Sequence, residues 1–202
     1  MTLEEVMHAA PVIPVLVLDG EHDAVALAET LVEAGLPVLE VTLRTPQALG
    51  AIRAMSGVPG AIVGAGTVLN EWQLFEAREA GARFIVAPGL TKPLTRAAAS
   101  TGLAYLPGVA TAGDIMRGLD LGLTRFKFFP AEASGGLAAL RALAAPFGSV
   151  RFCPTGGITE ASASDWLAEP AVTCIGGSWI MKKGMSLAAI GEAAKRAAAL
   201  HR

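Results

Sequence analysis

Residues 24–43 read AVALAETLVEAGLPVLEVTL and contain one helix-to-strand unit that recurs along the chain. The first part, Ala24–Ala34, has alanine, leucine and glutamate at helical spacing, and Gly35 follows it. Glycine is the preferred residue just past a helix end, because it adopts the left-handed conformation there without a Cβ clash. The second part, Val38–Leu43, is a short and mostly apolar run, typical of a strand that is covered on both faces. The stretch therefore predicts a helix that ends at glycine and leads into a buried parallel strand.

This alternation of helix and strand continues along the whole chain at regular intervals. Apolar strands that alternate with helices indicate a parallel sheet covered by helices. An unbroken series of eight units favours a closed (β/α)₈ TIM barrel over an open doubly wound sheet. We therefore expect a single α/β barrel domain over residues 1–202, with a short helix at Leu3–His8 before the first strand. The predicted strands are Val12–Leu18, Val38–Leu43, Ala61–Val68, Arg83–Pro88, Ala104–Val109, Arg125–Phe129, Arg151–Pro154 and Val172–Gly176.

Composition and charge restrict the possible partners of the protein. The chain has 202 residues, 52% of them hydrophobic, and a formal net charge of −2. It lacks the basic patch that binds nucleic acid, and the pair Lys182-Lys183 is interpreted as a solvated turn. The N-terminus is acidic, without a signal-peptide pattern, and no stretch approaches the roughly 20 apolar residues of a membrane-spanning helix. We expect a cytoplasmic protein without nucleic-acid or membrane partners, in which Cys153 and Cys174 are buried free thiols.

One lysine lies inside the sixth predicted strand, in the run Arg125-Phe126-Lys127-Phe128-Phe129-Pro130. Three phenylalanines stand close to it in the sequence, and apolar surroundings favour the neutral amine over the charged ammonium. A neutral amine can attack a ketone and form a Schiff base, whereas an ammonium cannot. The alternative is a structural lysine whose head group reaches water past a buried stem. The rest of the chain favours the Schiff-base interpretation of Lys127.

The second predicted strand carries three polar side chains at alternating positions. Glu40, Thr42 and Arg44 share one face of the strand, because side chains alternate across it. The face toward the helices must be apolar, so these three are expected to point into the barrel. A buried carboxylate is costly unless it is paired or used, and a structural Glu40–Arg44 ion pair is one interpretation. Near an inward Schiff-base lysine, Glu40 is instead the carboxylate that retro-aldol chemistry requires.

Two glycine pairs follow the last two predicted strands, in Thr155-Gly156-Gly157-Ile158 and Gly176-Gly177-Ser178. Backbone N–H groups after strands seven and eight of a (β/α)₈ barrel, leading into helix N-termini, commonly bind phosphate. The alternative is that each pair is only a turn. The earlier run Gly64-Ala65-Gly66-Thr67 is not a dinucleotide fingerprint, because Leu69 stands where the third glycine would be. The glycine pairs therefore predict a phosphate site at the barrel mouth.

The histidines offer no metal site at the barrel mouth. His8, His22 and His201 are the only three, and none ends a predicted strand. A metal-dependent aldolase would need a histidine-rich cluster at that edge. The expected mechanism is therefore the lysine one, with no metal and no cofactor.

Five motifs in order along the chain carry a family resemblance. They are EVTLRT (40–45), VGAGTVLN (63–70), FKFFPAE (126–132), RFCPTGGI (151–158) and CIGGSW (174–179). Together they resemble the bacterial 2-keto-3-deoxy-6-phosphogluconate (KDPG) aldolases, also called 2-keto-4-hydroxyglutarate (KHG) aldolases. The similarity extends from about Pro11 to Ile180. It implies a class I aldolase of the Entner–Doudoroff pathway, built on a (β/α)₈ barrel and assembled as a homotrimer.

The resemblance also implies roles for individual residues. It assigns the Schiff base to Lys127 and general acid/base catalysis to Glu40. Arg44 and Thr67 match the residues that hold the pyruvate carboxylate. The other matched positions are the phosphate-contacting Gly156, Gly157, Gly176, Gly177 and Ser178, and the pocket-lining Pro88, Phe129 and Thr155.

The expected reaction is cleavage of KDPG to pyruvate and glyceraldehyde 3-phosphate, with cleavage of KHG to pyruvate and glyoxylate as a second activity. An oxaloacetate decarboxylase that uses the same iminium is an alternative. A phosphate-binding barrel without Schiff-base chemistry, acting as a binding protein or isomerase, is another. Two departures from the family pattern, a short segment after Ile180 and a trimmed N-terminus, bear on the fit of the phosphate end and on subunit contacts.

Overall fold

The computed structural model describes residues 1–201 as nine helices and nine strands that alternate along most of the chain. Arg202, the last residue of the expected domain, lies outside the described residues. The strands are β1 (Val12–Leu16), β2 (Val38–Thr42), β3 (Ile62–Gly66), β4 (Phe84–Val86), β5 (Ala104–Leu106), β6 (Gly108–Val109), β7 (Arg125–Phe128), β8 (Arg151–Pro154) and β9 (Ile175–Gly177). The helices are α1 (Leu3–His8), α2 (Ala24–Glu33), α3 (Ala48–Met55), α4 (Glu71–Glu79), α5 (Lys92–Thr101), α6 (Ala112–Asp120), α7 (Gly136–Ala144), α8 (Ala163–Leu167) and α9 (Leu187–Ala198).

The strands pair in parallel and form two ladders. The larger has the order β5-β4-β3-β2-β1-β9, and the smaller has the order β6-β7-β8. Only Pro107 separates β5 from β6, and its carbonyl accepts a hydrogen bond from the Lys127 N–H at 2.8 Å. At the other ends of the ladders, an isolated bridge joins Thr155 to Gly176. The chain is thus an α/β fold with a curled parallel sheet.

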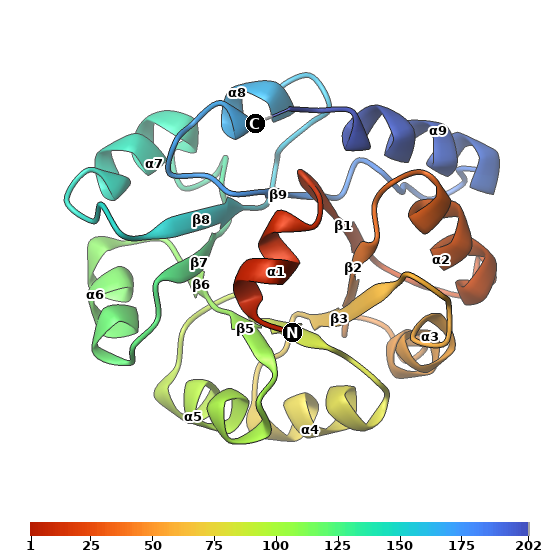
Figure 1. The fold of residues 1–202 in the computed structure, drawn as a ribbon, viewed down its shortest axis with the longest axis horizontal. Coiled ribbons are helices and arrows are strands. Elements are labelled where there is room, and N and C mark those ends of the chain that lie inside the picture. The colour runs from red at the N-terminus through yellow and green to blue at the C-terminus, as the bar shows by residue number, and fades with distance from the viewer. Residues whose placement is uncertain (202) are drawn as a thin grey trace.

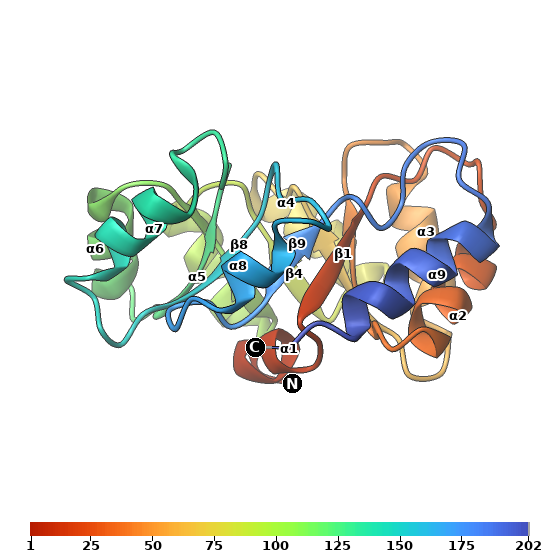
Figure 2. The same cartoon turned by 90° about the horizontal axis from the view of Figure 1, so that it is seen from above.

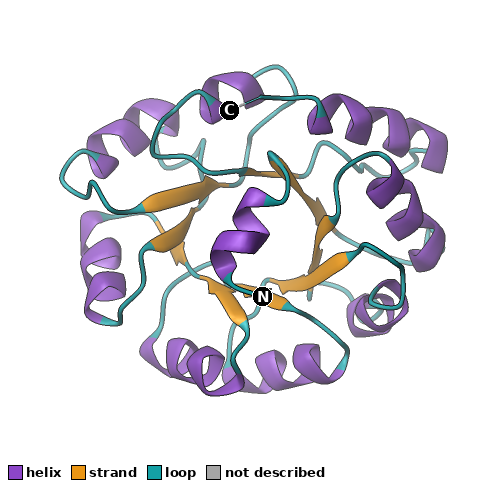
Figure 3. Cartoon of the chain, in the orientation of Figure 1, coloured by secondary structure: helices purple, strands orange, loops and turns teal. Residues whose placement is uncertain are grey.

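The helices lie outside the curled sheet and α1 lies across one end of it. Figure 1 and Figure 3 show the strands grouped around a common axis, with α2 to α9 around them. Figure 2, turned by 90° from the view of Figure 1, places α1 below the strands. Val6 and Met7 of α1 are buried against the sheet interior, and Glu4 accepts a hydrogen bond from Arg125 Nε at 2.6 Å. The N-terminal helix therefore closes the end opposite the predicted site.

Several local predictions are confirmed. Helix α1 has the limits that the sequence predicted. Gly35, expected just past a helix end, has a positive φ of 92°. Cys153 is a buried free thiol, and Cys174 is buried as well. Among the described residues, no helix is both long enough and apolar enough to cross a membrane.

Some strand limits were predicted wrongly. The strand expected over Ala104–Val109 divides at Pro107, because proline has no N–H group to donate to a ladder. The last strand begins at Ile175 rather than Val172, and Val172 makes only an isolated bridge to Phe152. Several other strands end earlier than expected. The apolar run of sequence extends past the last paired residue of these strands, because the loops that follow them also pack against the core. Apolar residues therefore did not mark the ends of the strands.

Candidate active site

A cavity of about 370 Å³ opens where the strands end, and its wall contains most of the side chains that the sequence singled out. Parallel strands end at the same edge of a sheet, so the side chains of their last residues converge there. The lining residues are Val15, Val17, Glu40, Thr42, Arg44, Thr67, Pro88, Lys127, Phe129, Thr155, Gly156 and Ser178. Of the predicted site residues, only Gly157, Gly176 and Gly177 are not part of this wall.

Lys127 of β7 and Glu40 of β2 form an ion pair in this cavity. Lys127 Nζ donates a hydrogen bond to Glu40 Oε1 at 3.1 Å. The two side chains are only 7% and 4% exposed, so little water separates or screens the charges. The Phe129 ring lies on the same amine, with its centroid 5.2 Å from Nζ. An amine and a carboxylate in direct contact can exchange a proton without a water molecule between them.

The expectation of three aromatic rings around this amine is wrong for two of them. Side chains alternate across a strand, so Phe126 and Phe128 lie on the opposite face of β7 from Lys127. Phe126 packs against Phe152, with centroids 6.5 Å apart, and Phe128 packs against Trp166 of α8 at 6.4 Å. Both rings belong to the layer between the sheet and the helices, and the surroundings of the amine are more polar than the sequence suggested.

Glu40 and Thr42 of β2, and Arg44 two residues after its end, all line the cavity, as alternation predicted. Thr42 Oγ1 donates to the carbonyl of Leu16 at 2.9 Å, and Arg44 Nε donates to Thr42 Oγ1 at 3.3 Å. Within residues 1–201 the ion pair of Glu40 is with Lys127, and none joins Glu40 to Arg44. Arg44 therefore keeps its terminal N–H groups available to an anion in the cavity.

Two backbone features shape the wall beside Glu40. A Cβ atom on Gly66 would overlap the Glu40 carboxylate, so glycine is needed for the carboxylate to lie where it does. The next residue, Thr67, has φ 59° and is the only non-glycine with positive φ among the described residues. For a β-branched residue this conformation costs on the order of 1–3 kcal/mol, and such strain is concentrated at functional sites.

The glycine turns differ from the prediction in one respect. Neither leads directly into a helix N-terminus, because α8 begins only at Ala163 and α9 only at Leu187. Gly156 and Gly157 of the turn after β8 have φ 103° and 84°, and Gly156 lines the cavity. Gly176 is required in β9 because a Cβ there would overlap Thr155 Oγ1. Gly176 and Gly177 are themselves the last residues of β9, so of the two pairs only Gly156-Gly157 forms a turn after its strand.

The histidines lie outside this cavity wall. His8 ends α1 and stands 3.4 Å from Glu4, while His22 lies in the connection between β1 and α2. Across residues 1–201, no group of three or more histidine, cysteine, aspartate or glutamate side chains could hold a metal ion. The ionisable side chains of the cavity are thus Glu40, Arg44 and Lys127.

Comparison with known families agrees with this geometry. The family model described as "KDPG and KHG aldolase" matches residues 3–192, which is most of the chain. The chain belongs to the KDPG and KHG aldolase family. The resemblance inferred from the five sequence motifs is thereby confirmed.

Individual members of this aldolase family are similar over their full length. The 2-dehydro-3-deoxy-phosphogluconate aldolase of Zymomonas mobilis is 56% identical over 201 residues, which cover 99% of this chain and 97% of that protein. A solved structure of the Zymomonas mobilis ZM4 enzyme with 3-phosphoglycerate has a TM-score of 0.96 at 56% identity and covers 99% of this chain and 96% of that one. The KDPG aldolase of Legionella pneumophila, with pyruvate captured as a covalent carbinolamine, has a TM-score of 0.94 at 40% identity and covers 98% of this chain and 99% of that one.

Sequence reasoning about this aldolase-family chain missed the contribution of β1. Val15 and Val17 line the cavity, yet nothing polar in their run distinguishes them from core residues. Strand register explains why Val15 belongs to the cavity wall. In the parallel pairing of β1 with β2, Val15 is the partner of Glu40 and stands beside it. An apolar position next to a predicted carboxylate on the neighbouring strand therefore belongs to the same pocket.

Proposed function

We propose that this protein is a class I aldolase that cleaves KDPG to pyruvate and glyceraldehyde 3-phosphate, and that it also cleaves KHG to pyruvate and glyoxylate. The observation that carries the proposal is the buried contact of 3.1 Å between Lys127 Nζ and Glu40 Oε1. The carbinolamine of pyruvate in the Legionella pneumophila relative supports covalent chemistry at a lysine. Family membership supports the choice of substrates.

The roles of the two residues follow from the bonds that must change. Lys127 loses a proton to Glu40 and attacks C2 of the substrate to give a carbinolamine. Glu40 then returns the proton to the C2 hydroxyl, which leaves as water and gives the iminium and the Glu40 carboxylate. A carboxylate then takes the proton of the C4 hydroxyl, the C3–C4 bond breaks, and its electrons enter the iminium to give an enamine and a free aldehyde. The enamine accepts a proton at C3, and water hydrolyses the iminium to release pyruvate and the amine. Glu40 is proposed for each of these proton transfers, which its contact with Lys127 Nζ supports.

The rest of the cavity supplies anion donors at two places. Arg44 and Thr67 are proposed to hold the pyruvate carboxylate, with the guanidinium as the charged donor. The turn N–H groups of Gly156 and Gly157, those of Gly176 and Gly177, and the Ser178 hydroxyl are proposed to receive the phosphate. Pro88, Phe129 and Thr155 are proposed to line the pocket between these ends.

We also propose that the sheet closes as a (β/α)₈ barrel domain, and that the protein is a cytoplasmic homotrimer. The Thr155–Gly176 bridge and the narrow break at Pro107 support closure of the sheet. For the trimer, the support is an exposed apolar set at α4, in which Leu69 is 57%, Trp72 is 72% and Phe75 is 41% exposed. Trp72→Glu is expected to convert the trimer to monomer in sedimentation, and a trimer that persists unchanged would move the interface elsewhere.

Reduction with borohydride tests the central proposal. Pyruvate and borohydride together should add one stable label per chain at Lys127, and the wild-type protein should release pyruvate from KDPG. Lys127→Arg should lose both the label and the release while it remains folded. A label at another lysine would contradict the assignment. No label with intact phosphate binding would favour the alternative of a barrel that binds phosphate without Schiff-base chemistry.

A further inference from the structure

Arg44 lies just past the end of β2, and a threonine on either side of it is hydrogen-bonded to the β1 segment. Thr42 Oγ1 donates to the carbonyl of Leu16 at 2.9 Å. Thr45 Oγ1 donates to the carbonyl of Leu18. The chain around Arg44 is thus attached to β1 and the loop after it at two points.

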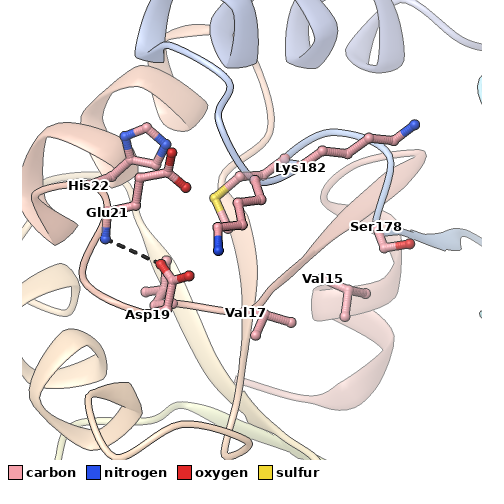
Figure 4. A pocket seen from close by; sticks show the side chains of 10 residues that line it. Val15, Val17, Asp19, Glu21, His22, Ser178 and Lys182 are labelled. Carbon is pink, nitrogen blue, oxygen red and sulfur yellow. Dashed lines mark hydrogen bonds between the residues drawn. The ribbon is translucent and has the colours of Figure 1, made fainter.

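The segment that carries these two carbonyl groups is itself held in place. Leu16 ends β1, is fully buried and lies beside Val41 in the register of the sheet. Figure 4 shows the segment from Val15 to Asp19, where it forms part of the wall of a neighbouring cavity of about 260 Å³. The dashed line in Figure 4 is the hydrogen bond that Asp19 Oδ1 accepts from the Glu21 N–H at 3.2 Å. The β1 segment therefore offers the two threonines a fixed point of attachment.

The Thr42 hydroxyl connects Arg44 to Leu16, and this connection has only one possible direction. The hydroxyl has a single hydrogen, which it donates to the Leu16 carbonyl. Its oxygen can therefore only accept from Arg44 Nε, which lies 3.3 Å away and can only donate. Thr42 is 1% exposed, so its hydroxyl is shielded from competing water. The orientation of this hydroxyl is thus set by β1 and not by the arginine.

The contact at Nε determines which part of the Arg44 guanidinium is left for a ligand. A guanidinium can bind a carboxylate with two parallel hydrogen bonds, either through Nε and one terminal nitrogen or through both terminal nitrogens. In Arg44 the Nε–H is already used, and no ion pair within residues 1–201 includes this residue. The edge with the two terminal nitrogens therefore remains. Arg44 is exposed, so without the contact at Nε its side chain would have many rotamers to lose on binding.

We propose that Thr42 is a positioning residue, whose hydroxyl holds Arg44 Nε so that the two terminal nitrogens face the carboxylate of the keto-acid substrate. This inference rests on the proposed aldolase function and gives a role to a residue that the proposal leaves without one. KDPG, KHG and pyruvate share this carboxylate, so all three should depend on Thr42. The carboxylate takes no part in the cleavage of the C3–C4 bond, so the dependence should appear in KM more than in kcat.

Thr42→Val tests the role of the hydroxyl, because valine has the same shape and cannot accept from Nε. We expect the KM for KDPG and for KHG, and the pyruvate concentration that half-saturates borohydride labelling, to rise about five- to tenfold. Thr42→Ala should show the same rise, whereas Thr42→Ser keeps the hydroxyl and should stay close to wild type. The matched control is Thr45→Val, which removes a neighbouring hydroxyl that donates to Leu18 and not to the guanidinium. It should change these values by less than about twofold.

A double-mutant cycle with Arg44→Met shows whether Thr42 acts through the arginine. In the Arg44→Met background, Thr42→Val should raise KM by less than about twofold, because the hydroxyl no longer has a guanidinium to hold. A rise as large as in the wild-type background would overturn the proposal. The same conclusion would follow from an equal rise in Thr45→Val, or from a loss in kcat with KM unchanged.

The pyruvate–borohydride label separates this inference from the aldolase proposal. Every Thr42 and Arg44 variant should still take the label at saturating pyruvate, because Lys127 is unchanged. An unaltered KM in Thr42→Val together with normal labelling would remove the role of Thr42 and leave the aldolase proposal standing. A wild-type protein that neither takes the label nor releases pyruvate would instead refute the aldolase proposal itself.

Discussion

Lys127 Nζ and Glu40 Oε1 are 3.1 Å apart, although β7 and β2 belong to different ladders of the sheet. The pair therefore joins the two ladders through the interior of the curled sheet. Transfer of one proton from Nζ to Oε1 converts the ion pair into a neutral amine and a carboxylic acid, with no change in net charge. The lysine can thus become a nucleophile without a proton passing to solvent, which burial of both side chains keeps away.

Glu40→Gln tests the proposed proton transfers directly. The amide keeps the shape of the side chain but cannot accept the proton of the C4 hydroxyl. We expect kcat for KDPG cleavage to fall by about 10²–10⁴-fold, with proton exchange at the pyruvate methyl group slowed in parallel. The pyruvate–borohydride label on Lys127 should still form, but more slowly, because Glu40 no longer accepts the proton from Nζ. Near wild-type turnover in this variant would leave Glu40 a purely structural role.

Lys127→Met tests the energetic side of the same pair. Removal of one partner leaves the Glu40 carboxylate buried and unpaired, which is expected to lower the free energy of unfolding by about 3–5 kcal/mol. The double variant Lys127→Met/Glu40→Gln should recover part of this loss, because no buried charge remains. Urea denaturation of the three proteins measures the difference. If the two variants are equally stable, burial of an unpaired carboxylate is not what destabilises Lys127→Met.

Gly66→Ala examines the close approach of β3 to Glu40. The added Cβ would overlap the Glu40 carboxylate, so the carboxylate must move away from Lys127. We expect kcat to fall by about tenfold or more, since positioned proton transfer is lost in part. The matched control is Gly50→Ala in α3, where a Cβ meets nothing and helix propensity favours alanine by about 1 kcal/mol. Equal kcat in the two variants would show that Glu40 has room to adjust.

Strand periodicity predicts much of the site. It does not predict the positions of residues in loops. Alternation placed Glu40, Thr42 and Arg44 in the cavity because each inward position is fixed by the backbone. The same rule, had it been applied to β7, would have removed Phe126 and Phe128 from the surroundings of Lys127. Side chains in loops have no such repeating pattern, so their directions cannot be read from their spacing in the sequence.

Tertiary contacts decide what the loops do. Sequence alone could not place Lys182 and Lys183 beside Ser178, because their position depends on the Glu21–Gly184 hydrogen bond between loops far apart in the chain. In the same way, the length of the strand near Pro107 depends on which backbone groups find partners in the neighbouring strands. The sequence therefore predicts which side chains face the cavity from strands better than which side chains reach it from loops.

Thr67→Gly should separate stability from substrate binding. Thr67 has φ 59°, a conformation that glycine adopts freely. Glycine removes the free-energy cost of the strained backbone in the folded state, and it also makes the unfolded chain more flexible, which opposes folding. We expect the first contribution to be larger, so the free energy of unfolding should rise by about 1 kcal/mol. The KM for KDPG should rise, because the residue proposed to hold the pyruvate carboxylate is lost. Thr67→Ala keeps the strained φ and should show the weaker binding without the gain in stability.

Glu4→Gln tests how strongly α1 is held across the end of the sheet. The hydrogen bond from Arg125 keeps the pKa of the Glu4 carboxyl below its usual value of 4.5, with a further contribution from His8. A lowered folded-state pKa means that the stabilisation is complete above the unfolded pKa and is lost as the pH falls through the folded one. The Glu4 side chain is half exposed, so solvent screening limits the contribution to less than about 1 kcal/mol.

The expected result is a small decrease in Tm at neutral pH, of no more than about 2–4 °C for a chain of this size. The difference between Glu4→Gln and wild type should shrink steadily below about pH 4, where the wild-type carboxyl also becomes neutral. Glu79→Gln, at an exposed position of α4 without an ion pair among the described residues, is the control for loss of a negative charge. A Tm difference for Glu4→Gln that stays constant from neutral to acid pH would mean that the Arg125 contact does not hold α1 through its charge.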